Sequence, residues 1–143
     1  MSENAIATVD TNAIAPVVDF NIPEGFICTV DLTTDEGAIN AANALGSAES
    51  MSNYGKDEFT VIDIITKPGT RAVTGESCTD VVLILDDGNC LFSQSVGILN
   101  SVQFMAASLG LERIHRGVRV KVTELTTRGG NTLKQLKVIG FAS

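Results

Sequence analysis

The chain has 143 residues, of which 44% are hydrophobic and 19% are charged, so it is large and apolar enough to fold as one domain. This composition excludes global disorder, and no apolar run approaches the roughly 18 residues of a membrane-spanning helix. The first residues lack the basic and apolar regions of a signal peptide, so we expect a cytoplasmic location and no membrane partner.

Charge is unevenly distributed along the chain. The formal net charge is −7, yet residues 1–66 contain eleven acids against the single base Lys56. Residues 67–143 contain nine basic residues and six acids. Because screening confines charge effects to about 8 Å at physiological salt, a basic groove can bind an anion on an acidic protein.

The N-terminal part predicts an arm and then a helix. Residues 1–24 have no sustained periodicity and are expected to form a flexible acidic arm, so the domain proper spans residues 25–143. Residues 26–32 read as a short strand or extended lead-in. Thr33 and Glu36 form a capping-box pattern, and Gly46 suits the end of a helix. The apolar positions between them at helical spacing are Ala38, Ile39, Ala42 and Leu45.

Strand patterns begin at Phe59. Residues 59–66 form a β-branched run, and the following Lys67-Pro68-Gly69 reads as a turn signal that opens a polar loop over residues 67–80. Residues 81–85 read as a short buried strand. Residues 86–89 read as a hairpin turn, and residues 90–94 as the returning strand.

The C-terminal part predicts one helix and two strands. Apolar residues at spacings of three and four predict a helix over residues 95–109, closed by Gly110. Val118, Val120 and Val122 alternate with polar residues and predict a half-buried strand with a basic outer face. A hairpin loop over residues 127–131 and a strand over residues 132–141 complete the order.

This order predicts a mainly β fold: a five-stranded OB-fold-like barrel with a helix after the third strand and an extra N-terminal helix. An OB-fold binds its ligand across the second and third strands, between the first–second and fourth–fifth loops. Other small barrels also fit five short strands.

Basic residues gather where that ligand would lie. Lys67 and Arg71 belong to the predicted first loop, and Arg128 and Lys134 to the last hairpin. The residues in phase to face outward on the last two strands are Arg119, Lys121 and Lys137. Single-strand binding needs cations along a phosphate track and flat faces for stacking, and Phe92 is the best aromatic candidate. The alternatives are that the cations form an ordinary solvated face and that Phe92 belongs to the core.

No catalytic centre, metal site or cofactor is predicted. The cysteines Cys28, Cys78 and Cys90 are far apart in sequence, without a C-x-x-C pair, and are expected to be reduced and mostly buried. His115 is the only histidine, and it is expected to be exposed rather than catalytic. The chain contains no nucleophile motif and no phosphate-binding glycine motif.

Several spaced segments resemble the single-stranded DNA-binding proteins of bacteriophages and mobile elements. The segments that carry this resemblance are Asn40–Leu45, Val61–Arg71, Cys78-Thr79, Asp87-Gly88, Phe92–Ser95, Gly97-Ile98, Ser101 and Gly130–Lys134. The resemblance covers about residues 33–139. The chain departs from bacterial relatives of that group, which end in an acidic tail, because its acidic segment is N-terminal; this leaves the recruitment of protein partners in doubt.

The resemblance implies an OB-fold protein without enzymatic activity that coats single-stranded DNA in replication or recombination, in the host cytoplasm if phage-encoded. Its implied DNA contacts are Lys67, Arg71, Phe92, Ser93, Gln94, Arg128 and Lys134. Implied partners are single-stranded DNA and replication or recombination proteins, and homo-oligomerisation is left open. The net charge and the 5% aromatic content favour the alternative, a phage structural or assembly protein that uses a small β-barrel to bind proteins.

Overall fold

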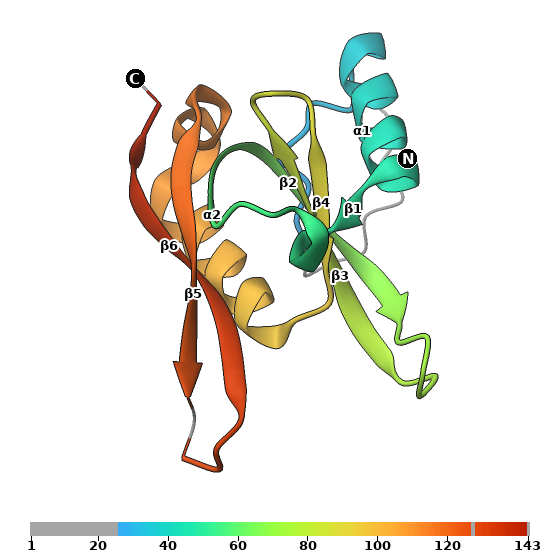
Figure 1. Cartoon of the computed structure of the whole chain (residues 1–143). Coiled ribbons are helices and arrows are strands. Elements are labelled where there is room, and N and C mark those ends of the chain that lie inside the picture. Colours follow the sequence, from blue (N-terminus) through green and yellow to red (C-terminus); the bar gives the residue numbers. More distant parts are fainter. Residues whose placement is uncertain (1–25, 127, 143) are drawn as a thin grey trace.

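The structure is a computed structural model that describes residues 26–126 and 128–142 (Figure 1). The predicted arm, residues 1–24, lies outside the described residues. The helices are α1 (Asp35–Ser47), the 3₁₀ turn η1 (Met51–Asn53) and α2 (Val96–Arg116). The strands are β1 (Glu49–Ser50), β2 (Glu58–Thr70), β3 (Ser77–Leu85), β4 (Cys90–Ser93), β5 (Val118–Thr126) and β6 (Thr132–Phe141).

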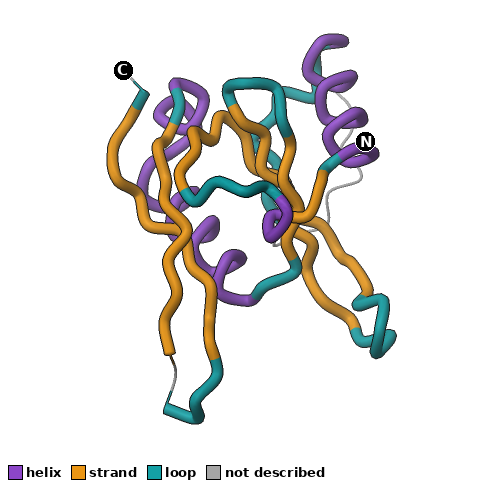
Figure 2. The backbone as a smooth tube through the Cα atoms, viewed as in Figure 1, coloured by secondary structure: helices purple, strands orange, loops and turns teal. Residues whose placement is uncertain are grey.

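The strands form one curled sheet in the order β1-β4-β3-β2-β5-β6. The mainly β, broadly barrel-like architecture with two helices is therefore confirmed. The strand count differs from the predicted five, because Glu49 and Ser50 pair in parallel with Leu91 and Phe92 and add a short edge strand. Among the described residues β6 pairs only with β5, so the sheet is a half-barrel with two open edges (Figure 2).

The curled sheet has a core on each face. The larger core joins α2 residues Ile98, Val102 and Met105 to inward-facing residues of five strands. The smaller core packs Ala41 and Ala44 of α1 against the opposite face of β2, β3 and β4. Successive residues of a strand point to opposite faces, so the unbroken apolar run Val81–Leu85 of β3 serves both cores at once.

An irregularity in β2 lets the strand serve both cores as well. The register against β3 shifts between Val61 and Asp63, as at a β-bulge. Val61 and Ile64, three residues apart, consequently both enter the larger core, whereas Ile65 enters the smaller one.

The predicted loop over residues 67–80 is wrong. Strands β2 and β3 continue into this segment, with Lys67 opposite Asp80 and Pro68 opposite Thr79. Only residues 71–76 form a turn, which the Arg71 N–H closes by donating to Glu76 O. The amide of Thr66 donates to Ile27 O, on the side of β2 away from β3. Pro68 is two residues further along the strand, so its nitrogen also faces away from β3. The proline therefore removes no hydrogen bond from the hairpin.

Helix α1 differs from its prediction in its start, its packed face and its end. The N-cap is Thr34, whose hydroxyl accepts the Gly37 N–H, while Thr33 instead bonds Asp31. The helix buries Ala41 and Ala44 against the sheet and exposes Ile39 and Leu45. It ends at Ser47, so Gly46 lies inside it.

Helix α2 extends beyond its predicted end. Gly110 interrupts it with a φ of 79°, which accounts for the predicted stop, but helical structure resumes and continues to Arg116. Further along, the predicted alternation of β5 is confirmed at Val118 and Val120, which are fully buried on either side of the exposed Arg119. Beyond them Lys121, Val122 and Thr123 are all half-buried. None of the helices within residues 26–126 and 128–142 is both long and apolar enough to cross a membrane.

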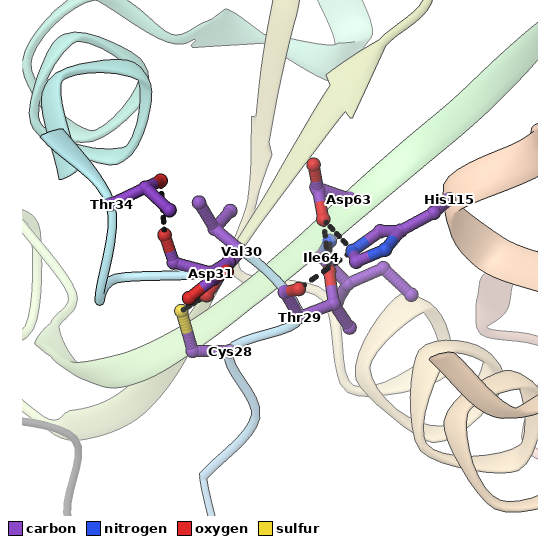
Figure 3. Close-up of polar contacts among 8 residues, drawn as sticks. All are labelled: Cys28, Thr29, Val30, Asp31, Thr34, Asp63, Ile64 and His115. Atoms are coloured by element: carbon purple, nitrogen blue, oxygen red, sulfur yellow. Dashed lines mark hydrogen bonds and ion pairs between the residues drawn. The ribbon is translucent and has the colours of Figure 1, made fainter. Parts of the chain in front are cut away.

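The segment before α1 is tied to the sheet and to the end of α2. Thr29 N–H donates to Ile64 O, and the Thr29 hydroxyl donates to Asp63 Oδ1 at 2.7 Å while accepting the Ile64 N–H (Figure 3). His115 Nε2 lies 2.8 Å from Thr29 O and 2.9 Å from Asp63 Oδ1. Both neighbours are acceptors, so this nitrogen carries a proton, and the histidine connects three elements.

Candidate nucleic-acid interface

Two hairpins extend to the same end of the molecule. In Figure 1 the β2–β3 hairpin and the β5–β6 hairpin both project downward, with the first turns of α2 between them in that view. The predicted loop residues Arg71 and Arg128 belong to these two hairpins. This end of the fold therefore carries the candidate site, and the residues at the bases of the hairpins define its chemistry.

Lys67 does not project freely into this site. Its Nζ lies 2.9 Å from Asp80 Oδ2, directly across the β2–β3 hairpin. Asp80 is 6% exposed and also accepts the Gln94 side-chain N–H at 2.8 Å and the Cys78 thiol at 3.9 Å. One buried carboxylate thus holds a lysine from β2 and a glutamine from the end of β4.

The Asp80 cluster is built around a glycine. A β-carbon at Gly69 would overlap the Asp80 carboxylate, so the absence of a side chain there makes room for the ion pair. Burial alone would raise the pKa of Asp80, but hydrogen bonds from Lys67 and Gln94 and the charge of Lys67 outweigh it, and the pKa lies below its usual value. Asp80 is therefore ionised at neutral pH.

Arg71 is held near the same cluster. Its Nη2 donates to Gln94 O at 3.3 Å, and the Gln94 amide nitrogen donates to Thr70 O at 3.2 Å. These bonds connect the tip of the β2–β3 hairpin to the segment that joins β4 to α2. Unlike Lys67, Arg71 has no acidic partner in the described ion pairs, so its charge is available to an anion.

Phe92 packs within the protein. It is half-buried against the smaller core, where Ala41 and Ala44 of α1 also lie. The face of β4 toward which it packs is covered by a helix whose charged residues, Asp35 and Glu36, are acidic. Of the two interpretations that the sequence leaves open for Phe92, this packing favours the core.

A pocket of about 300 Å³ lies where the half-barrel is open. One wall comes from one edge of the sheet, and the opposite wall includes Lys134 from the other edge. Its lining residues are Ser50, Met51, Ser52, Phe92, Ser93, Gln94, Ser95 and Lys134. Four of the ten predicted site residues therefore meet in one place, and Arg71 adjoins them through Gln94.

Close contact between α2 and β6 fixes the lysine side of the pocket. A β-carbon at Gly97 would overlap Lys134 O and crowd Leu133, so the helix approaches the strand as closely as a glycine allows. Ser101 Oγ accepts the Leu136 N–H at 3.0 Å on the otherwise open edge of β6. The backbone of Lys134 is thereby held against the start of α2.

The remaining predicted residues lie apart from the pocket. Arg119, Lys121 and Lys137 alternate with inward-facing residues on β5 and β6, and Lys121 lies directly opposite Lys137. Arg128 is exposed near the tip of the β5–β6 hairpin. The structure thus divides the predicted cations between a pocket, a hairpin tip and an outer sheet face.

Sequence reasoning missed Asp80 and the wall formed by Ser50, Met51 and Ser52. Asp80 could have been found by extending the hairpin through Pro68, because Lys67 and Asp80 then face each other as an opposite-charge pair. No local signal identifies the serines, because their position depends on a parallel pairing between β1 and β4.

The three cysteines and the histidine form hydrogen bonds within the fold. The three cysteines are free and half-buried. Burial is the main cause that raises the pKa of the Cys28 and Cys90 thiols. His115 has a side chain 40% exposed and is bonded to Thr29 and Asp63. Within the described parts of the chain, no three His, Cys, Asp or Glu side chains gather as metal ligands.

Comparison of the chain with protein-family profiles, with curated proteins and with solved structures gave no match.

Proposed function

We propose that this protein binds single-stranded DNA without strong sequence preference, through the end of the fold that carries the two hairpins. The observation that carries the proposal is the pocket between the sheet edges, which brings Lys134, Gln94 and four serines together beside Arg71. Such a site needs cations along the phosphate track and flat faces for base stacking. The pocket supplies the cation, and its hydroxyl and amide groups can form hydrogen bonds with base edges.

The strand order supports an OB-like reading of the fold. If β2, β3, β4, β5 and β6 are the five barrel strands, α2 follows the third strand, as an OB-fold requires. The ligand-flanking loops of that fold correspond to the β2–β3 and β5–β6 hairpins. In this reading β1 and α1 are additions that precede the barrel.

The described contacts suggest how the strand would lie. We place phosphates against Arg71, Lys134 and Arg128, since these three cations occur on or beside the two hairpins. Lys67 acts indirectly, because its ion pair with Asp80 reduces its charge toward a phosphate. Arg119, Lys121 and Lys137 offer a second cationic surface for a strand that continues past the hairpins.

Coating of single strands during phage or mobile-element replication or recombination is the biological role that best fits this activity, given the resemblance described above. A gel shift tests the binding directly. We expect labelled oligothymidylate to be retarded at micromolar protein and the matched duplex to bind more weakly, because stacking needs exposed base faces. Equal retardation of duplex and single strand would contradict the proposal.

A second candidate is a protein-interaction module of a phage structural or assembly protein. It is favoured by apolar side chains on the outer side of α2, where Phe104 is 74% exposed and Leu111 is 55% exposed. Apolar side chains that remain exposed are available for contact with a protein partner. Failure to bind any single strand at low salt would favour this second candidate.

A further inference from the structure

We infer that the pocket between the sheet edges holds one nucleobase of the bound strand, turned out of the stack with its neighbours. This inference rests on the proposed function and assigns the pocket a ligand class, a nucleobase rather than a phosphate. It also gives a role to Ser50, Met51 and Ser52, which precede the barrel strands.

The volume of the pocket fits one nucleobase. At about 300 Å³ the pocket is at the lower end of the range for small-molecule sites, so it suits a single ring system and not a run of stacked bases. It is walled by η1 with β1, by β4 and by β6, three parts of the fold that the chain brings together from far apart. A base that enters must therefore leave the stack.

The hydroxyl groups that line the pocket can form hydrogen bonds with a base edge. Ser50 Oγ and Ser52 Oγ bond each other at 2.8 Å, which uses one hydroxyl proton and leaves one to donate. Ser93 Oγ accepts the Ser95 N–H at 3.1 Å, so its own O–H remains available. A rotating hydroxyl can donate or accept, so this wall can satisfy the edge of any base.

The charge at the pocket favours a base over a phosphate as the enclosed group. Lys134 is the one cation among the lining residues, and it belongs to the β6 side. A site for phosphate alone would be expected to surround the anion with several cations or backbone donors. One lysine beside uncharged hydroxyls instead suits a nucleotide whose phosphate lies at the rim and whose base lies within.

Filling the pocket tests the inference. Ser52→Phe places a ring on the η1 wall, and Asn53→Phe is the matched control, since Asn53 is an exposed neighbour in the same turn that does not line the pocket. We expect Ser52→Phe to weaken oligothymidylate binding about tenfold or more, on the scale of one lost base contact, and Asn53→Phe to leave it unchanged. Equal melting temperatures would verify that both variants fold.

A second readout separates base from phosphate. Amide NMR spectra of the wild-type protein would be recorded with thymidine monophosphate, with thymidine and with inorganic phosphate. We expect thymidine monophosphate and thymidine to shift the amides of Ser52, Gln94 and Ser95. Shifts caused equally by phosphate, with none from thymidine, would overturn the base assignment.

The two proposals fail in different ways. If the wild-type protein binds no oligonucleotide, the proposed function fails and takes the base assignment with it. If the wild-type protein binds but Ser52→Phe binds as tightly as Asn53→Phe, the pocket inference alone is overturned.

Discussion

Lys67 Nζ lies 2.9 Å from Asp80 Oδ2, across a hairpin that the sequence suggests is a loop. This ion pair gives the lysine a structural role, because its charge is already matched by a buried carboxylate. Asp80 also holds Gln94, whose carbonyl accepts from Arg71. The pair therefore acts on the candidate site by positioning its neighbours.

Asp80→Asn is expected to lower the free energy of unfolding by about 1–3 kcal/mol, the cost of removing charged hydrogen bonds and leaving Lys67 without its partner. Asp86→Asn, in the exposed turn after β3, is the control and should change stability little. Chemical denaturation of both variants measures the difference. Equal stabilities would show that the Asp80 cluster does not support the hairpin.

The same ion pair predicts an acid dependence. Because the pKa of Asp80 is lowered on folding, its contribution is fully present above the unfolded value of about 3.9 and is lost as the pH falls through the folded pKa. Below about pH 4 the stability advantage of wild type over Asp80→Asn should therefore shrink. Asp31 and Asp87 also have lowered pKa values, but both proteins share them and they cancel in the difference. A constant gap down to acid unfolding would refute this origin of the stability.

Phe92→Ala separates packing from stacking. Because Phe92 packs against α1, we expect the variant to lose about 2–4 kcal/mol of stability, slightly less than a fully buried phenylalanine. The folded fraction should still bind oligothymidylate, with at most a several-fold loss of affinity, because Phe92 also forms part of the pocket wall. Melting temperature and affinity measured on the same sample decide the matter. Unchanged melting with weaker binding would return Phe92 to the DNA-binding surface.

Two glycines in helices should respond oppositely to alanine. Gly97→Ala is expected to destabilise the protein by about 1–3 kcal/mol, because the new methyl group would overlap Lys134 O and push α2 from β6. Gly46→Ala meets no atom within 4 Å and should be neutral or raise stability by up to about 1 kcal/mol, since alanine favours a helix. Thermal melts compare the two. A harmless Gly97→Ala would mean that the lysine side of the pocket is not fixed by this contact.

The sequence predicts an element of this fold where the pattern of neighbouring residues determines it, and fails where contacts with distant segments determine it. The alternation of Val118 and Val120 identifies β5 because burial on one face repeats every second residue. Pro68 misleads, because proline is typical both of turns and of strand positions whose nitrogen faces away from the neighbouring strand. The hydrogen bond from Thr66 to Ile27 shows that the second case applies here. For α1 the larger apolar residues misled, since the face that packs on the sheet carries Ala41 and Ala44 and leaves Ile39 and Leu45 exposed.

The candidate site was predictable only in part. The charge pattern predicts Lys134 and Arg71 as site residues, and the structure places them on the β5–β6 and β2–β3 hairpins. The partnership of Lys67 with Asp80 and the wall that Ser50 and Ser52 contribute depend on contacts between distant strands. Periodicity carries no information about such contacts.

Phosphate contacts should differ from remote cations in their salt dependence. Arg128→Ala is expected to weaken binding to all sequences alike and to reduce the slope of log affinity against log salt by about 0.7. Arg113→Ala is the control, because Arg113 lies at the opposite end of α2 and donates to Leu109 O. Fluorescence anisotropy at several salt concentrations gives both slopes. Identical slopes for the two variants would remove Arg128 from the phosphate track.

Single-stranded DNA binding is tested most directly by the salt dependence of oligothymidylate binding by the unmodified protein, measured by anisotropy between about 50 mM and about 200 mM salt. About four phosphate contacts predict a slope near −3, from about −0.7 per contact. We expect micromolar or tighter affinity at the low-salt end, weakening along that slope. An absence of binding at the lowest salt concentration, or an affinity that does not respond to salt, would contradict single-stranded DNA binding by this fold.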